Sequence, residues 1–228
     1  MLPNIKTTIL TLFICSLALN AAAQKWDSTF RPAGFALKWE LFKSFPNSKK
    51  DIVFLGNSIT AGVDFNELLS NTRVRNRGIS GDISFGILER LQEVTEGKPS
   101  KVFILIGIND ISRNIPDTVI INNYKKIIHT LKAASPKTKI YFQTLLPVNN
   151  EFTQFKNHYN KDEHILFVNA ALKDLAAKEK INLVDLYPHF LNKDNKLEKA
   201  YTIDGLHLNA AGYSVWADIL KKGKYLKN

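Results

Sequence analysis

Short apolar runs alternate with longer amphipathic segments over most of this chain, and this alternation restricts the folds open to it. The apolar runs are residues 52–55, 74–76, 102–106, 140–144 and 183–186. Helical spacing is found in residues 36–45, 64–70, 84–96, 118–134, 161–180 and 210–222. Residues 102–106 (Val-Phe-Ile-Leu-Ile) are apolar without alternation, as in a central strand covered on both faces. Strand-helix alternation of this kind predicts an α/β fold with a parallel sheet and helices on both faces.

The first two dozen residues have the composition of a secretory signal peptide. Lys6 precedes an apolar stretch over residues 9–19, and three alanines follow at residues 21–23. This pattern predicts cleavage after Ala23, because small residues mark such sites. The apolar stretch is too short for a spanning helix with flanking anchors. We therefore expect a signal peptide at 1–23, one domain over 24–228, and export to the periplasm or medium without stable membrane insertion.

The remaining composition excludes several kinds of site and partner. The single cysteine, Cys15, lies inside the predicted signal, so the mature chain would have no disulfide, cysteine nucleophile or thiolate metal site. The net charge is +10, which fits either an anionic partner such as an acidic glycan or a lysine-rich solvated surface. No Arg-rich run with interleaved aromatics is present, so nucleic acid is not an expected partner. The oligomeric state is left open.

Four short segments stand at or just beyond predicted strand ends. They are residues 56–58 (Gly-Asn-Ser), 78–82 (Gly-Ile-Ser-Gly-Asp), 107–110 (Gly-Ile-Asn-Asp) and 204–207 (Asp-Gly-Leu-His). The first three each follow their strand along the chain, so in a parallel sheet they open on the same edge. Open α/β folds bind their ligands at that edge. The sequence therefore places a candidate site there.

Ser58 follows a strand that breaks at Gly56, and alone it could be either a helix N-cap or a nucleophile. His207 could take its proton, and Asp204 could hold His207 in the correct tautomer. The order Ser, Asp, His is that of the α/β-hydrolases. Their Gly-x-Ser-x-Gly elbow is absent, however, because Thr60 stands where its second glycine belongs. The residues predict a Ser-His-Asp triad without that elbow.

Acyl transfer also needs donors for the developing oxyanion, each worth about 10²–10³ in rate. The candidates are the backbone N–H groups of Ser58 and Gly81 and the side-chain amide of Asn109. Glycine at position 81 lets the backbone approach a ligand closely, and Asn109 is a neutral donor that does not compete as a base. Three such donors beside a Ser-His pair make an ester carbonyl the expected substrate.

Other polar and aromatic residues receive supporting roles. Asp82 and Asp110 each follow a candidate donor, and we expect them to brace their loops rather than to catalyse. Phe152 and Phe155 follow the fourth predicted strand, in a loop that could border the acyl or sugar pocket. No metal site is expected, because the remaining histidines lack ligand spacing and are interpreted as surface or packing residues. They are His129, His158, His164 and His189.

The four segments, in order, resemble the signature blocks of the SGNH hydrolases, also called the GDSL esterase/lipase family. The resemblance implies Ser58 as nucleophile, His207 as base and Asp204 as its orienter. It implies Gly81 and Asn109 as oxyanion donors together with the Ser58 amide. The implied fold is a flavodoxin-like three-layer α/β/α sandwich around a five-stranded parallel sheet, with neither cofactor nor metal.

Asn57 departs from the family pattern, since the family name records Asp at that position. We expect altered local hydrogen bonding there with activity retained.

Residues 77–82 and 143–148 also resemble the branch related to platelet-activating-factor acetylhydrolase subunits and to bacterial sialate or carbohydrate O-acetylesterases. That branch implies a secreted serine esterase for short acyl esters, commonly acetyl, and the basic chain would suit acetylated acidic sugars such as sialic acid. The alternatives are a lysophospholipase or general short-chain lipase, and a secreted glycan-binding protein without turnover.

Overall fold

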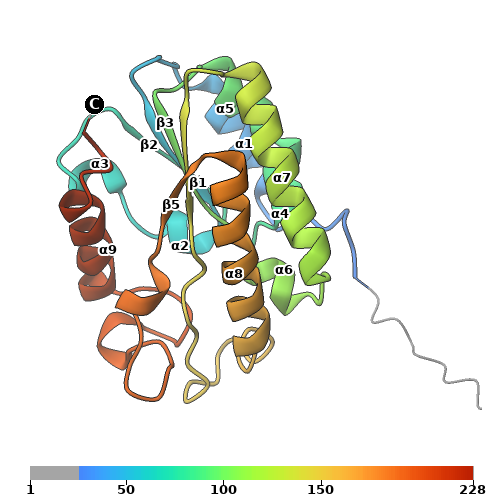
Figure 1. Ribbon diagram of the computed structural model, residues 1–228, viewed down its shortest axis with the longest axis vertical. Helices are drawn as coiled ribbons and strands as arrows, with labels where there is room; N and C mark the ends of the chain where they lie inside the picture. Colours follow the sequence, from blue (N-terminus) through green and yellow to red (C-terminus); the bar gives the residue numbers. More distant parts are fainter. Residues whose placement is uncertain (1–25, 228) are drawn as a thin grey trace, which may run out of the picture.

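A five-stranded parallel sheet lies at the centre of the computed structural model, which describes residues 26–227 (Figure 1). The predicted signal peptide and the start of the predicted domain lie outside the described residues. The strands are β1 (Ile52–Gly56), β2 (Val74–Gly78), β3 (Lys101–Leu105), β4 (Lys139–Gln143) and β5 (Asn182–Val184). Their order is β2-β1-β3-β4-β5, and each neighbouring pair is parallel. The predicted sheet is confirmed.

The strand order reverses between β1 and β3. From β1 the chain first moves outward to β2, then crosses back to β3 and continues to β4 and β5 on the other side. The carboxyl ends of β1 and β3, at Gly56 and Leu105, are therefore adjacent at a topological switch point. Ligands of open α/β sheets bind at such points. Ser58 follows β1 and Asn109 follows β3, so the fold brings both segments to this edge.

Helices cover both faces of the sheet, as a three-layer α/β/α sandwich requires (Figure 1). On one side lie α3 (Phe65–Leu68) and α9 (Ala210–Lys222). On the other lie α1 (Phe35–Ser44), α4 (Ser84–Glu89), α5 (Leu91–Glu96), α7 (Asp117–Ala134) and α8 (Asp162–Glu179). Short helices α2 (Ser58–Ala61) and α6 (Ile108–Ser112) begin just after β1 and β3. Two 3₁₀ turns, Tyr187–His189 and Lys199–Tyr201, precede α9.

Stacked aromatic rings hold the centre of the sheet against α3 and α9. The Phe54 ring lies 4.1 Å from that of Phe65 and 4.8 Å from that of Phe103, which in turn lies 4.5 Å from Tyr141. Trp216 meets Phe65 edge-on at 4.9 Å. All five side chains are buried, and aromatic pairs add about 0.5–1.5 kcal/mol each beyond area burial. This packing fixes β1 and β3 relative to each other, and with them the edge that carries the candidate site.

Most predicted elements are present, with two differences. The five strands and the helices α1, α3, α7, α8 and α9 lie within two residues of the predicted bounds. The single helix predicted over 84–96 is wrong, because Arg90 interrupts it and separates α4 from α5. Helix α6 was not predicted, since its residues were interpreted as a loop segment. Within residues 26–227, no helix combines the length and apolar character needed to cross a bilayer.

Candidate active site

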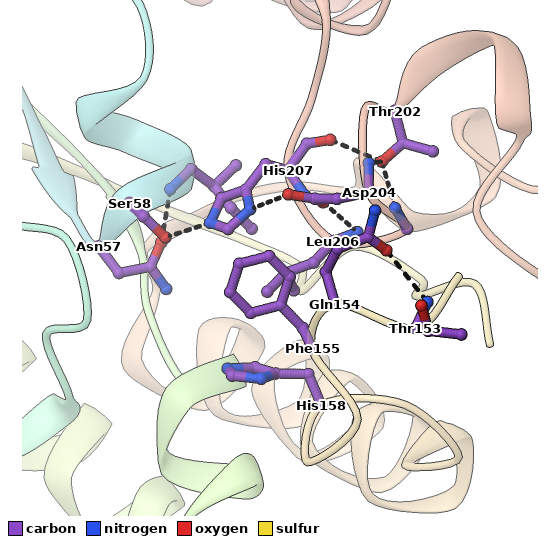
Figure 2. Close-up of polar contacts among 12 residues, drawn as sticks. Asn57, Ser58, Thr153, Gln154, Phe155, His158, Thr202, Asp204, Leu206 and His207 are labelled. Carbon is purple, nitrogen blue, oxygen red and sulfur yellow. Dashed lines mark hydrogen bonds and ion pairs between the residues drawn. The ribbon is translucent and has the colours of Figure 1, made fainter. Parts of the chain in front are cut away.

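A hydrogen-bonded chain of three side chains connects Ser58, His207 and Asp204 (Figure 2). His207 Nε2 lies 2.9 Å from Ser58 Oγ, and His207 Nδ1 lies 2.7 Å from Asp204 Oδ2. Ser58 and His207 are 149 residues apart in the sequence. The structure therefore brings together the three residues that the sequence singled out. In this geometry the ring could accept the Ser58 proton on one nitrogen while the carboxylate holds a proton on the other.

The turn before α9 explains why Asp204 and His207 point the same way. Asp204 Oδ1 accepts hydrogen bonds from the backbone N–H groups of Leu206 at 3.0 Å and His207 at 2.8 Å. Thr202 Oγ1 accepts from the Gly205 N–H at 2.8 Å and donates to the His207 carbonyl at 2.6 Å. Gly205 has a φ of 79°, a backbone angle that residues with a side chain rarely adopt. These bonds hold the side chains of Asp204 and His207 next to each other although the turn is not helical.

The same bonds set the charge of Asp204. Burial opposes ionisation of this carboxyl, but hydrogen bonds from the His207 backbone and ring and from the Leu206 N–H outweigh it. The pKa of Asp204 is lowered as a result. Asp204 is therefore ionised at neutral pH and can accept a hydrogen bond from the Nδ1–H of His207.

Asn57, and not Ser58, caps the short helix that starts at the end of β1. Asn57 Oδ1 accepts from the Ile59 N–H at 3.0 Å, and Ser58 is the first residue of α2. The cap therefore leaves the Ser58 hydroxyl free to meet His207. Within the described residues, the buried Asn57 Nδ2 has no hydrogen-bond partner. An Asp at this position would place an acceptor there in its stead.

The candidate oxyanion donors lie in neighbouring segments. Gly81, in the turn after β2, has a φ of 79°, and a Cβ there would lie 2.9 Å from Pro32 Cβ. Its N–H has no hydrogen-bond acceptor in the part of the chain that the structure describes. Asn109 Nδ2 donates to the Asp82 carbonyl at 2.9 Å, which ties the segment after β3 to the one after β2. An amide nitrogen carries two hydrogens, so one N–H of Asn109 is left for a ligand.

His158 is a residue of this region that the sequence interpretation did not include. It was placed among surface or packing histidines, yet its Nε2 lies 2.9 Å from Asn109 Oδ1. Figure 2 shows Phe155 between the two histidines, and its ring meets His207 edge-on at 4.9 Å and His158 at 5.8 Å. His158 and Asn109 are 49 residues apart, and no spacing pattern joins them. The position of Phe155 agrees with a place beside the pocket, while the pocket itself stays a prediction.

Two of the other histidines form surface pairs. His129 Nε2 lies 3.1 Å from Glu179 Oε1, and His164 Nδ1 lies 2.9 Å from Asp117 Oδ2, with both rings exposed. Among residues 26–227, no group of three or more His, Cys, Asp or Glu side chains is arranged to hold a metal ion.

Asp110 joins the segment after β3 to the start of α4. Its two carboxylate oxygens each accept from the Ser84 N–H at 3.0 Å, and Oδ1 also accepts from Ser84 Oγ at 2.5 Å. Asn123 on α7 donates to the same hydroxyl at 2.8 Å. Asp110 is completely buried. These contacts agree with the bracing role expected from the sequence.

Asp82 and Arg90 form a second buried brace. Arg90 Nε donates to Asp82 Oδ2 at 3.0 Å, and both side chains are inaccessible to solvent. Arg90 Nη2 also donates to the Gly56 carbonyl at 3.1 Å, at the end of β1. The pair therefore links the turn that carries Gly81 to the strand end that precedes Ser58. It also explains the break between α4 and α5, because Arg90 turns into the core.

The contribution of Asp110 to the stability of the protein should decrease as the pH rises from about 4 to about 7. Burial raises the pKa of Asp110 from its ordinary value of about 4 to about 7. The folded chain therefore keeps a proton that the unfolded chain releases in this range, which costs on the order of 4 kcal/mol of unfolding free energy by pH 7. In Asp110→Asn this pH slope should be markedly shallower. Urea unfolding across the range measures the slope.

The matched control is Asp174→Asn, which changes an exposed carboxyl on α8. This control should keep the wild-type slope, whatever small change it makes to stability at a single pH. An Asp110→Asn variant with the full wild-type slope would show that another group holds the proton.

Comparisons with known proteins identify a family and several relatives. The model of the GDSL-like Lipase/Acylhydrolase family matches residues 54–215, which include all the candidate site residues. An N-acylneuraminate cytidylyltransferase from Streptococcus agalactiae is 28% identical over 82% of this chain, which spans only 40% of that relative. The isoamyl acetate-hydrolyzing esterase of Saccharomyces cerevisiae is 24% identical, covering 82% of this chain and 86% of the esterase. A solved structure from Streptococcus pneumoniae, named for platelet activating factor, is 30% identical to this chain, with a TM-score of 0.75. The match covers 84% of this chain and 91% of the chain in that structure.

Proposed function

The chain belongs to the GDSL-like lipase/acylhydrolase family, and from this premise we propose that it is a serine esterase that hydrolyses short acyl esters through Ser58, His207 and Asp204. The observation that carries the proposal is the hydrogen-bonded chain from Ser58 Oγ through His207 to Asp204. This arrangement matches a nucleophile with a base within reach and a carboxylate that orients the base. The esterase name of the yeast relative adds support.

The reaction proceeds through an acyl-enzyme. Ser58 Oγ attacks the ester carbonyl carbon as His207 Nε2 takes its proton, and Asp204 stabilises the imidazolium while staying ionised. The N–H groups of Ser58 and Gly81 and the Asn109 amide donate to the oxyanion of the tetrahedral intermediate. The C–O bond then breaks, and the alcohol leaves with the proton from His207. A water molecule, deprotonated by His207, attacks the acyl carbon and releases the acid and free Ser58.

We further propose that the acyl group is acetyl and that the alcohol is a carbohydrate such as sialic acid. Three observations support this proposal. The net charge of +10, or +9 without Lys6 of the proposed signal peptide, favours acidic substrates. The yeast relative is named for an acetate ester, and the Streptococcus agalactiae relative is named for N-acylneuraminate. A lysophospholipase or general short-chain lipase is the competing function. Comparison of acetylated sialic acid, acetylated xylo-oligosaccharide and lysophospholipid separates the two. Faster turnover of the lysophospholipid would overturn the sugar proposal.

The esterase proposal itself is tested with p-nitrophenyl acetate. The purified wild-type protein should release p-nitrophenol above the rate of a matched Ser58→Ala variant. Equal rates would sink the esterase proposal and favour a glycan-binding protein that keeps the fold without turnover. The substrate comparison should be interpreted only after this first result.

Export belongs to the same proposal. We infer that residues 1–23 act as a signal peptide and that the mature chain starts at Gln24. Amino-terminal sequencing of the protein recovered outside the cytoplasm should begin at Gln24. Recovery of the uncleaved chain from the cytoplasm alone would contradict export.

A further inference from the structure

Both the nitrogen and the oxygen of the Asn109 side-chain amide have hydrogen-bond partners. Its Nδ2 donates to the Asp82 carbonyl at 2.9 Å, and its Oδ1 lies 2.9 Å from His158 Nε2. Asn109 is buried, with 7% of its surface exposed, so water has little access to replace these partners. A flipped amide would direct Oδ1 at the Asp82 carbonyl, which is also an acceptor. The two contacts therefore select one orientation, which leaves an N–H of Asn109 unused.

We propose that His158 is a positioning residue of the oxyanion site: its Nε2–H donates to Asn109 Oδ1, which fixes the amide and strengthens the N–H that remains for the oxyanion. The inference rests on the proposed function, because the oxyanion arises only during ester hydrolysis. The strengthening follows from polarisation, since an amide whose oxygen accepts a hydrogen bond becomes a better donor through its nitrogen.

The segment around His158 is held on both sides of the candidate site. The next residue, Tyr159, donates its hydroxyl to the Asp204 carbonyl at 2.5 Å and accepts from the Phe155 N–H at 3.2 Å. The His158 N–H donates to the Phe155 carbonyl at 2.8 Å. One short turn thus contacts Asn109 through His158, His207 through the Phe155 ring and Asp204 through Tyr159. His158 is therefore in a braced position and can orient Asn109 reproducibly.

The surroundings of His158 favour its neutral form. Burial lowers the pKa of His158 to about 4, and the proximity of His207 and Arg113 acts in the same direction. A neutral ring has one N–H donor, and the Asn109 Oδ1 acceptor assigns that proton to Nε2. A neutral His158 also adds no charge beside His207, which must itself become positive during the reaction.

A double-variant cycle tests the proposal. His158→Ala should reduce kcat for p-nitrophenyl acetate between about 10-fold and 10²-fold, with a small change in KM, because the remaining N–H acts on the transition state. Asn109→Ala should cause a larger loss of about 10²–10³. When Asn109 is already alanine, His158→Ala should cause no further loss. The same loss in both backgrounds, or wild-type kcat in His158→Ala, would overturn the proposal.

Two further variants separate positioning from general damage. His158→Gln keeps an N–H donor and should recover part of the lost kcat, whereas His164→Ala removes an exposed histidine on α8 and should leave kcat unchanged. Equal losses in His158→Gln and His158→Ala, with unchanged thermal melting, would argue against a donor role. If His158→Ala does not fold, His158→Gln carries the test, made both in the wild-type protein and in the Asn109→Ala variant.

A measurement without turnover distinguishes this proposal from the esterase proposal. In a proton–nitrogen NMR spectrum, the side-chain amide signals of Asn109, assigned with Asn109→Ala, should move in His158→Gln and stay in place in His164→Ala. Unmoved signals contradict the positioning role even if the wild-type protein is an active esterase. Moved signals with an inactive wild-type protein would support the contact while the esterase proposal fails.

Discussion

Replacement of Ser58, of His207 or of both by alanine should reduce kcat for p-nitrophenyl acetate by nearly the same factor, on the order of 10⁴–10⁶. The reason is that the two side chains act as one unit. His207 Nε2 lies 2.9 Å from Ser58 Oγ, so the hydroxyl loses its base when His207 is removed, and the base has no nucleophile when Ser58 is removed. The measurement is single-variant and double-variant kinetics with thermal melting as a check on folding.

The matched control for His207→Ala is His129→Ala, which removes an exposed histidine paired with Glu179. This control should keep wild-type kcat. A double variant whose loss equals the product of the two single losses would contradict the account, because independent groups would then be responsible. Residual activity in the alanine variants is expected from the oxyanion donors and substrate binding, which these substitutions leave in place.

Arg90→Met should lower the free energy of unfolding by about 3–5 kcal/mol at neutral pH, because it leaves a buried carboxyl without its partner. The side chains of Asp82 and Arg90 are inaccessible to solvent, and Arg90 Nε lies 3.0 Å from Asp82 Oδ2. Burial already raises the pKa of Asp82, even with Arg90 beside it. Without Arg90, Asp82 should take up a proton more readily, so the loss should be smaller at low pH. Guanidinium unfolding at several pH values measures both effects.

Neighbouring charges provide the controls for Arg90→Met. Glu89→Gln removes the charge of a partly exposed carboxylate that accepts a hydrogen bond from Arg31 Nε at 2.6 Å. This variant should lower the free energy of unfolding by less than about 1 kcal/mol. The double variant Asp82→Asn with Arg90→Met removes both buried charges and should recover much of the lost stability. Equal losses in Arg90→Met and Glu89→Gln would mean that the buried pair contributes no more than a surface pair.

The Arg90 substitution should also reduce esterase activity in the molecules that remain folded. Arg90 Nη2 donates to the Gly56 carbonyl, two residues before Ser58, and Asp82 follows Gly81 directly. Loss of this link frees the turn after β2 from the end of β1. The buried pair thus joins the core of the protein to the geometry of its candidate site.

The sequence was sufficient to predict the sheet and the residues that meet at its edge. Strands such as residues 102–106 are apolar throughout and long enough to be recognised locally. Ser58 could be selected because parallel strands bring the segments that follow them to one edge. Asp204 and His207 do not follow a strand directly, and they were selected by residue type, by their spacing and by the resemblance to the family's last block. Local pattern and topology were both needed for this result.

Features that depend on tertiary contacts were beyond the sequence. The break at Arg90 arises because its side chain pairs with Asp82 in the core, which overrides helix propensity over residues 84–96. The helix expected over residues 36–45 was predicted from the spacing of its apolar residues, yet Leu37, Leu41 and Phe45 in that range are exposed, from 41% to 66%. His158 reaches Asn109 only through the path of the segment after β4, which no local pattern specifies.

The most direct test of the central claim is to identify the residue that becomes acylated. The wild-type protein is treated with an alkyl fluorophosphonate, which labels activated serines, and the modified peptide is sequenced by mass spectrometry. We predict one adduct, on Ser58, that is absent in Ser58→Ala and strongly reduced in His207→Ala. An adduct on another serine, or turnover of p-nitrophenyl acetate that survives without any label on Ser58, would contradict the account.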